Sequence, residues 1–369
     1  MSKKSLNVIK SQVRALTAYT LAPERNAVKL NQNENPWGAS EVIKQEVWRQ
    51  IYERQWSRYP DFTPATLREK LAWHTGWKAD GILIGNGSNE MIQSTLSATV
   101  SPGVKVMISQ PTFAVYKQVA TINGGRVIDV PLTSDFKFDV PGILKTIEVE
   151  QPEVIFICSP NNPTGGMIDE KDLLKVLIAA PGIVVVDEAY YEFSGYTAVP
   201  LLSKFENLVV LHTFSKAIGM AGLRIGYLMT SPDMAREINK VILPYNLNVF
   251  SRIAAETALE FYETEVKPQI HLILKERDRV FARLREITGV DPVPTTTNFI
   301  LCRLALEPKL VFDKLKASDV LVRDVSAAPA LKDCLRFSIG TPKENDRLVT
   351  TLEEIFSVAE QYAVRKGGS

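Results

Sequence analysis

The sequence predicts an α/β protein with a large domain built on a mainly parallel β-sheet flanked by helices, followed by a smaller α+β domain. From about residue 80, short β-branched runs alternate with helical patterns, which is typical of strand–helix–strand units. The runs are apolar throughout, as strands covered by helices on both faces should be. From about residue 250, one long helical stretch and three short strands replace this alternation. The change of pattern indicates a second domain.

Chain length favours the same two-domain interpretation. With 369 residues, the chain exceeds one typical hydrophobic core. We expect a large domain over residues 36–255 and a small domain over residues 256–369. Residues 1–35 lack the pattern of the sheet, and we expect them to pack on the small domain or on a partner subunit.

Six apolar runs of the large domain are predicted strands: residues 104–109, 125–131, 154–160, 183–189, 207–214 and 224–230. Helical patterns lie between them, and the segment 169–180 opens with acidic residues, as helices often do. In the small domain we expect a long helix over residues 251–287, interrupted near Pro268 because proline breaks the hydrogen-bond ladder. Three short strands and a closing helix are expected after it: residues 296–304, 319–325, 334–340 and 342–361.

Composition argues against several classes of partner and compartment. The formal net charge of +1 gives no electrostatic attraction for nucleic acid or for an anionic membrane. The three cysteines are widely spaced, which fits neither a disulfide framework nor a metal cluster and favours the cytoplasm. The three histidines show no ligand spacing, so no metal is expected. We find no signal peptide and no run near the roughly 18 apolar residues of a membrane span.

Polar and reactive side chains collect where the predicted strands end. Asp187 and Tyr190 close the stretch VVVDEAYYEF, Asn162 lies in SPNNPTG after another strand, and Lys216 follows a third. Ligands of such sheets bind outside the carboxyl ends of the strands, so these side chains should meet at one edge. Taken singly, each has an ordinary alternative as a turn residue or a solvated loop residue.

Two further features at this edge suit an anion. Gly87, Ser88 and Asn89 precede a predicted helix, whose backbone N–H groups and dipole can seat a phosphate, although an ordinary glycine turn would look the same. Arg224 opens a buried strand, an unfavourable place for a charge unless it meets an anion.

One ligand, pyridoxal phosphate, accounts for all of these residues together. Its aldehyde needs a lysine amine, which Lys216 offers, and its ring nitrogen needs a carboxylate, which Asp187 offers. Its phenolate oxygen, ring face and phosphate find partners among the remaining residues: Asn162, Tyr190, Phe113, Gly87, Ser88, Asn89, Thr213, Ser215 and Arg224.

The motifs that carry these residues resemble a known family, the pyridoxal-phosphate-dependent aminotransferases of the aspartate aminotransferase fold. SPNNPTG, VVVDEAYYEF, TFSKAIGMAGLRIGY and LRFSIG occur in the order and with the spacing of that family. Within it, KLNQNENPWG, SRYPD, GNGSNE, PTFAVY and VLVRD are most similar to histidinol-phosphate aminotransferases. The resemblance implies a fold-type I chain with a seven-stranded sheet, assembled as a homodimer whose active sites are shared between subunits.

The resemblance also assigns roles to individual residues. It implies Lys216, Asp187 and Tyr190 as catalytic residues, and a phosphate site of Ser88, Asn89, Thr213, Ser215 and Arg224 completed by Tyr59 from the neighbouring subunit. It implies a substrate site of Arg336 for a carboxylate and Arg323 for a phosphate, with Asn162 and Tyr19. The chain departs from the family at three places: a Tyr-x-Pro-Gly element is replaced around Tyr19, Asn89 stands for aspartate, and Phe113 stands for tyrosine.

The activity implied by the resemblance is transamination of histidinol phosphate with 2-oxoglutarate, giving imidazole acetol phosphate and glutamate in histidine biosynthesis. An aromatic aminotransferase and a threonine-phosphate decarboxylase of the same fold are alternatives, as is a regulator that binds the cofactor without turnover. Glu188 is interpreted as a turn or salt-bridge residue, because neighbouring strand residues face opposite ways. The early tryptophans are interpreted as core or dimer packing: Trp48, Trp56, Trp73 and Trp77.

Overall fold

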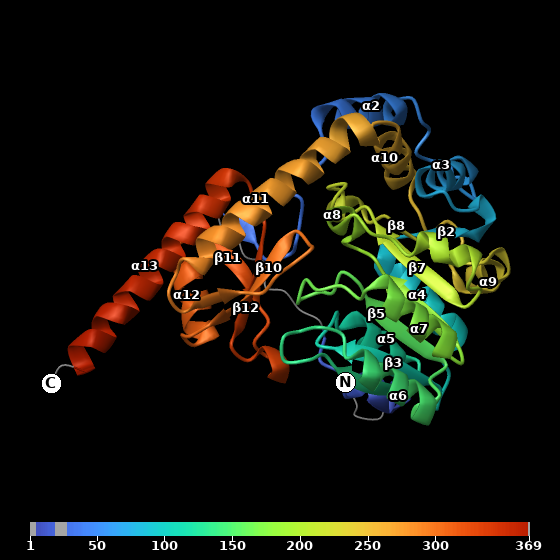
Figure 1. Ribbon diagram of the computed structural model, residues 1–369. Helices are drawn as coiled ribbons and strands as arrows, with labels where there is room; N and C mark the ends of the chain where they lie inside the picture. The colour runs from blue at the N-terminus through green and yellow to red at the C-terminus, as the bar shows by residue number, and fades with distance from the viewer. Residues whose placement is uncertain (1–4, 19–27, 368–369) are drawn as a thin grey trace.

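The computed structural model of the protein describes residues 5–18 and 28–367. It has two lobes, one built on a seven-stranded sheet and the other on a five-stranded sheet (Figure 1). Within the described ranges, no helix is both long and apolar enough to cross a membrane.

The seven-stranded sheet has the order β2-β8-β7-β6-β5-β3-β4. Neighbouring strands from β4 to β7 are parallel, and β8 alone runs against the others, between β7 and β2. The predicted α/β class with a mainly parallel sheet is therefore confirmed. The six predicted runs each contain a strand, and β2 adds a short seventh: β2 Ile82–Gly85, β3 Lys105–Gln110, β4 Arg126–Pro131, β5 Val154–Cys158, β6 Ile183–Asp187, β7 Leu208–Thr213 and β8 Gly226–Met229.

Successive residues of the central strands face two separate cores. Val184 and Val186 of β6 join the core on one face, and Val185 between them joins the core on the other face. Each buried valine stabilises the fold by about 1.5–3 kcal/mol relative to an exposed one, so both faces favour apolar residues. Helices cover this sheet, and further helices follow in the chain before the second lobe. In chain order they are α4 Ser88–Thr99, α5 Val115–Ile122, α6 Val140–Glu150, α7 Glu170–Ala179, α8 Tyr191–Ser194, α9 Pro232–Ile238 and α10 Val249–Glu260.

The five-stranded sheet has the order β1-β11-β12-β10-β9 and combines distant parts of the chain. Its edge strand β1 is paired in parallel with β11, so residues just before the large lobe belong to the sheet of the other lobe. Its strands are β1 Val28–Leu30, β9 Val290–Pro292, β10 Phe299–Leu304, β11 Val320–Asp324 and β12 Cys334–Ser338.

The long helical stretch is interrupted where proline predicted an interruption. Helix α10 ends at Glu260, a turn of π-helix spans Tyr262–Val266, and α11 begins at Lys267 with Pro268 in its first turn. Helix α11 then runs along the second lobe (Figure 1). The remaining helices are α1 Ser11–Arg14, α2 Glu41–Tyr52, α3 Ala65–Thr75, α11 Lys267–Arg285, α12 Pro308–Ala317 and α13 Pro342–Gly367.

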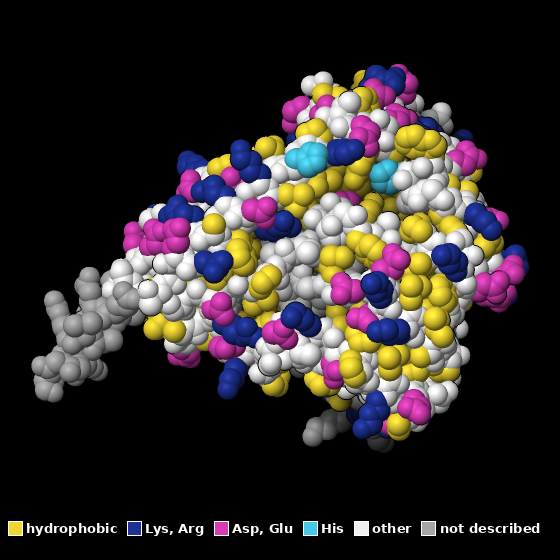
Figure 2. Space-filling model, viewed as in Figure 1, with side chains coloured by type: hydrophobic (Ala, Val, Ile, Leu, Met, Phe, Trp, Pro, Cys, Tyr) yellow, Lys and Arg dark blue, Asp and Glu magenta, His cyan; other side chains and the backbone are white. Residues whose placement is uncertain are grey.

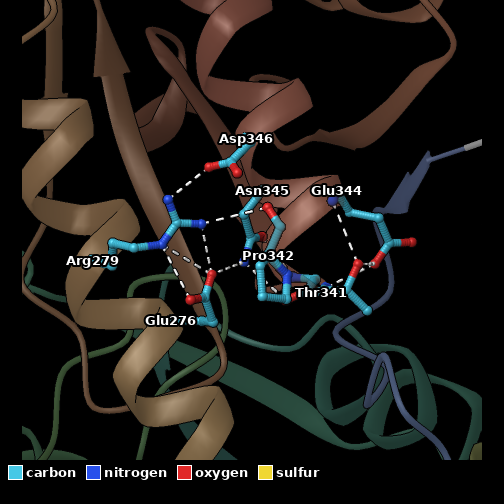
Figure 3. Close-up of polar contacts among 8 residues, drawn as sticks. Glu276, Arg279, Thr341, Pro342, Glu344, Asn345 and Asp346 are labelled. Atoms are coloured by element: carbon cyan, nitrogen blue, oxygen red, sulfur yellow. Dashed lines mark hydrogen bonds and ion pairs between the residues drawn. The ribbon is translucent and has the colours of Figure 1, made fainter.

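A polar network joins α11 to the start of α13 (Figure 3). Glu276 of α11 accepts a hydrogen bond of 2.7 Å from Arg279 and one of 3.0 Å from the buried Asn345. Arg279 also donates to Asp346 at 2.6 Å, and Asn345 closes a ring of hydrogen bonds with the backbone of Gly340. The network ties both helices to the segment that follows β12.

The first turn of α13 carries a capping box. The Thr341 backbone N–H donates to the Glu344 carboxylate at 2.7 Å, and the Glu344 N–H points back to the Thr341 hydroxyl at 3.4 Å (Figure 3). Pro342 occupies the first helical position, where its missing N–H costs nothing. These contacts fix the start of α13 only a few residues after β12 ends at Ser338.

We expect Glu276→Gln to lower the free energy of unfolding by about 1–3 kcal/mol at neutral pH, because the charge-assisted hydrogen bonds weaken. Burial alone would raise the pKa of Glu276, but hydrogen bonds from Arg279 and Asn345 outweigh it and lower the pKa below 4.5. The stabilisation should therefore be complete above that ordinary value and disappear as the pH falls through the lowered folded-state pKa.

Chemical unfolding of both proteins at a series of pH values measures this difference. Glu286→Gln, at an exposed position just after the same helix, is the matched control and should unfold like the wild type. A stability difference that stays constant into acid, or an equal loss in the control, would contradict the prediction.

Candidate active site

Asp187 lies at the carboxyl end of β6 and is 3% exposed. Its Oδ2 accepts a hydrogen bond of 2.6 Å from the Tyr116 hydroxyl, and its Oδ1 accepts one of 3.1 Å from the Ala189 N–H. Burial raises the pKa of Asp187, while the hydrogen bond from Tyr116 opposes that rise. The strand thus ends in a desolvated carboxylate that is held by two donors.

Lys216 follows the adjacent strand β7, which is paired with β6 in parallel. Its Nζ donates a hydrogen bond of 2.8 Å to the backbone carbonyl of Gln32. Burial, together with the positive charge of Arg336, lowers the pKa of Lys216 to about 8. An amine with this pKa is far more often neutral near physiological pH than an exposed lysine, so it can act as a nucleophile or a base.

Tyr190 and Asn162 lie beside Arg336, the arginine that the family resemblance assigns to a substrate carboxylate. The Tyr190 hydroxyl accepts a hydrogen bond of 2.9 Å from the Asn33 side chain. Arg336, on β12, donates to the Asn162 Oδ1 at 2.6 Å and to the Asn31 carbonyl at 2.8 Å. Burial raises the pKa of Tyr190 to about 12, which keeps its phenol protonated at neutral pH.

A cradle for an anion forms where α4 begins. Gly87 has a φ of +85° and lies so close to Arg224 that an added Cβ would meet its Nη2 at 2.6 Å. Gly226 packs even more tightly on the backbone of Ser88, since an added Cβ would lie 2.1 Å from the Ser88 nitrogen. We call this feature the anion cradle; its donors come from the α4 N-terminus and from three side chains, Thr213, Ser215 and Arg224.

Hydrogen bonds within the anion cradle place these side chains together. The Thr213 hydroxyl donates to the Ser215 hydroxyl at 3.0 Å and accepts from the Ser215 N–H at 3.2 Å. Arg224 Nη1 lies 3.5 Å from the Ser215 hydroxyl, and Arg224 itself has a left-handed φ of +55°. A pocket of about 280 Å³ opens beside Ser215, towards residues of β1 and the end of β12.

Arg323 and Arg336 are directly opposite each other on the antiparallel strands β11 and β12. Opposite residues of such a pair have their side chains on the same face, a few ångströms apart. Two like charges in this relation repel each other, so a negatively charged ligand at this face of the sheet would be favoured.

The structure does not bring every predicted residue to this place. Asn89 is exposed in the first turn of α4, whereas Phe113 lies near the cluster, since its ring and that of Tyr116 form an edge-to-face pair at 5.6 Å between centroids. Tyr59 is 81% exposed and stacks on Tyr245 at 4.6 Å, so within one subunit it is outside the cluster. Tyr19 lies outside the described residues.

Sequence reasoning missed a polar segment that crosses the site. The segment 31–35 supplies the Gln32 carbonyl that Lys216 contacts and the Asn33 side chain that contacts Tyr190. Asn35 continues the segment with a hydrogen bond of 2.9 Å to the Ala217 carbonyl. The available signal was a run of asparagines with neither helix nor strand periodicity, next to an Asn-Pro turn.

The structure decides between the alternatives left open for Glu188 and for the early tryptophans. Glu188 is buried, where it pairs with His212 at 2.8 Å and accepts hydrogen bonds from Thr197 and the Ala198 N–H at 2.6 Å. The salt-bridge alternative predicted for Glu188 is therefore the one that the structure supports, and the residue joins β6 to β7. The tryptophans that reach solvent, and so are not core residues, are Trp48, Trp56 and Trp73.

Comparisons with known proteins agree with the site described above. Residues 25–352 match the family model described as aminotransferase class I and II. The chain belongs to this family. Its relatives include histidinol-phosphate aminotransferases of Thermoanaerobacter pseudethanolicus, 37% identical over 95% of this chain and 99% of the relative, and of Chlorobaculum tepidum, 38% identical over 89% and 94%. The family predicted from the motifs is thereby confirmed.

Solved structures of aminotransferases have the same fold. The histidinol-phosphate aminotransferase of Sinorhizobium meliloti, in complex with pyridoxal-5'-phosphate, aligns with a TM-score of 0.86 at 24% identity, covering 95% of this chain and 97% of that one. The enzyme of Clostridium acetobutylicum aligns with a TM-score of 0.83 at 26% identity, covering 89% and 99%. The predicted fold-type I architecture is confirmed by this agreement.

We expect the chemical reactivity of Lys216 to rise with pH around a midpoint of about 8. Below that pH the amine is protonated and unreactive, and above it the neutral amine predominates. Reductive methylation of the ligand-free protein, followed by peptide mass spectrometry, measures the rate at each lysine. Exposed lysines serve as internal controls, and their reactivity should have a midpoint at about pH 10.4. A Lys216 midpoint in the range of those controls would contradict the prediction.

Proposed function

We propose that this chain is a pyridoxal-phosphate-dependent aminotransferase that converts histidinol phosphate and 2-oxoglutarate into imidazole acetol phosphate and glutamate. The step belongs to histidine biosynthesis. The observation that carries the proposal is the buried Lys216 amine on the strand next to the buried Asp187 carboxylate, with the anion cradle at the same sheet edge. The names of the relatives at 35–38% identity support the substrate.

The residues present fit the cofactor. The glycine at 87 leaves room that a Cβ would fill beside Arg224, and the surrounding donors are backbone N–H groups, hydroxyls and a guanidinium, as a phosphate monoester requires. Asp187 would hold the ring nitrogen, Asn162 and Tyr190 would contact the phenolate oxygen, and Phe113 would cover a ring face. When bound, the cofactor supplies an electron-withdrawing ring that acidifies the substrate carbon next to the amine.

Lys216 supplies the proton-transfer chemistry in this proposal. With a pKa of about 8, its amine can take a proton from the substrate carbon and return it to a neighbouring atom without a large energy penalty in either direction. Release of the Gln32 carbonyl frees the amine for this role. Tyr190 keeps its proton at neutral pH and can therefore donate a hydrogen bond throughout the reaction.

The paired arginines Arg323 and Arg336 fit the two substrates in turn. Arg336 would pair with a carboxylate of glutamate or 2-oxoglutarate in bidentate fashion, and Arg323 would contact the phosphate of histidinol phosphate. A guanidinium can pair with either anion, which suits a site that accepts a dicarboxylate and a phosphate ester alternately. Asn162, already held by Arg336, lies beside both ligands in this arrangement, and Tyr19 keeps its predicted substrate role.

We also propose a homodimer with shared active sites. Hydrophobic side chains reach the surface over the part of the molecule where α2, α3 and α10 lie (Figures 1 and 2). A large apolar surface on a soluble chain is typical of an interface. Exposed aromatic residues of α2, α3 and the segment between them support this surface: Trp48, Tyr52, Trp56, Tyr59, Phe62 and Trp73. The three cysteines, all free and buried, suit the cytoplasm.

The decisive experiment adds histidinol phosphate to the protein loaded with pyridoxal phosphate, and then adds 2-oxoglutarate. We expect the absorption band of the bound cofactor to shift with the first addition and to return with the second, with imidazole acetol phosphate and glutamate found by mass spectrometry. A shift with phenylalanine but not with histidinol phosphate would favour an aromatic aminotransferase. Release of carbon dioxide from threonine phosphate would favour the decarboxylase.

Substitution of Arg323 tests the phosphate contact directly. We expect Arg323→Ala to lower kcat/KM for histidinol phosphate by about 10- to 100-fold, because a charged hydrogen-bond pair is lost. The loss for an unphosphorylated aromatic amino acid should be much smaller. Arg303→Ala is the matched control, since Arg303 lies on the same sheet with its guanidinium over Phe136 at 4.3 Å. Equal losses for both substrate classes would remove Arg323 from the phosphate site.

Mixing two inactive variants tests the contribution of Tyr59 across the dimer. Tyr59→Ala and Lys216→Ala subunits, unfolded and refolded together, should regain roughly a quarter of wild-type activity, because half of the dimers then hold one intact site. Each variant refolded alone is the control. If the mixture gains no activity, Tyr59 and Lys216 serve the same subunit's site.

A further inference from the structure

Tyr116 is a buried residue whose hydroxyl reaches a catalytic carboxylate from a different element. It lies in the first turn of α5, has no exposed surface, and donates to the Asp187 Oδ2 at 2.6 Å. Its ring stacks on Phe156 of β5 at 4.7 Å between centroids, and it forms an edge-to-face pair with Phe113 at 5.6 Å between centroids. One side chain therefore touches both the predicted partner of the ring nitrogen and the predicted partner of the ring face.

The geometry of the carboxylate leaves a defined place for a ligand. The Ala189 N–H occupies one lone pair of Oδ1, and the Tyr116 hydroxyl occupies one lone pair of Oδ2. A carboxylate has about four acceptor positions, so the two donors fix its plane and leave acceptor positions for a third donor. The ring nitrogen of a bound pyridine, when protonated, is such a donor.

Charges around Asp187 make the phenol more than a packing group. The other titratable groups coupled to Asp187 are Cys158, its register partner on β5, and three others: Glu188, Tyr190 and His212. Burial raises the pKa of Asp187, and the hydrogen bond from Tyr116 is the largest influence that lowers it. Burial also raises the pKa of the Tyr116 phenol well above its ordinary value, so the phenol keeps its proton and donates a hydrogen bond to the carboxylate.

We propose that Tyr116 is a positioning residue for the cofactor: its hydroxyl orients the Asp187 carboxylate towards the ring nitrogen, and its ring contact sets the position of Phe113. This inference rests on the proposed function. A phenylalanine at the same position would fill almost the same volume and keep the contacts with Phe156 and Phe113. The hydroxyl is thus the part of the side chain that carries the role.

The first measurement follows Asp187 in the protein without cofactor. Protein with ¹³C-labelled aspartate carboxyls is titrated by NMR, and Asp187→Asn identifies the resonance of Asp187 by removing it. We expect Tyr116→Phe to move the Asp187 midpoint upward by about one to two pH units, because a hydrogen bond to the charged form is lost. A purely structural role of Tyr116 would leave this midpoint unchanged.

Tyr227→Phe is the matched control. Tyr227 is also buried on this sheet and its hydroxyl lies 2.9 Å from His212 Nδ1, so the variant removes a buried phenol hydroxyl that does not touch Asp187. We expect it to keep the wild-type Asp187 midpoint. An equal upward shift in both variants would overturn the inference, since the shift would then reflect general loosening of the sheet.

The second measurement is the affinity of each protein for pyridoxal phosphate across a range of pH. At a pH between the two measured Asp187 midpoints, Tyr116→Phe should bind about tenfold more weakly than the wild type, and the two affinities should converge at a pH well above both midpoints. If the wild type binds no pyridoxal phosphate, the proposed function fails. If the wild type binds it and Tyr116→Phe matches the wild type in both measurements, only the inference about Tyr116 fails.

A second variant covers the case in which Tyr116→Phe does not fold. Tyr116→Met removes the hydroxyl and leaves a flexible apolar side chain that can fill the buried space, and its Asp187 midpoint should rise by more than about half a pH unit if donation is the role. A folded Tyr116→Met protein with the wild-type Asp187 midpoint would overturn the inference.

Discussion

The need of a buried backbone for hydrogen-bond partners organises this active site. Segment 31–35 crosses between the lobes away from any regular ladder, so its carbonyl groups must find side-chain donors. Two of the donors are residues of the proposed site: Arg336 donates to the Asn31 carbonyl and Lys216 donates to the Gln32 carbonyl, and the Asn33 side chain donates in turn to Tyr190. The side chains to which we assign substrate binding and proton transfer therefore also hold this segment in place.

Desolvation gives these groups their chemistry. The same burial that lowers the pKa of Lys216 raises the pKa values of Asp187 and Tyr190, because a low-dielectric surrounding favours the neutral form of each group. Specific partners then determine how far the pKa of each group shifts. Arg336 and Lys216 repel each other as like charges, which lowers the pKa of Lys216. The hydrogen bond from Tyr116 stabilises the negatively charged form of Asp187. The sheet edge thus holds a base, an acid and a hydrogen-bond donor within one dry region.

The sequence predicted the residues whose positions follow from local order and missed those that depend on long-range packing. Asp187 and Lys216 each follow an apolar strand, and parallel strands bring their carboxyl ends to one edge, so a local pattern was enough. Strand β2 was missed as an apolar run because it spans only four residues before its glycine turn. Tyr116 was missed because nothing within a helix turn signals that its hydroxyl meets a strand about 70 residues later. A salt bridge was one alternative predicted for Glu188, but its partner His212 was missed for the same reason, since the contact joins two strands that are far apart in sequence.

The parallel pairing of β1 with β11 has a consequence for the order in which the protein is made. Val28 leaves the ribosome early, but its partner Val320 follows about 290 residues later. Closing so long a loop is slow, and it comes after the large lobe has been synthesised. The segment that Lys216 contacts can therefore dock only when translation is almost finished. A nascent chain stalled before β11 would carry the lysine and its sheet but lack the docked strand that brings Gln32 to it.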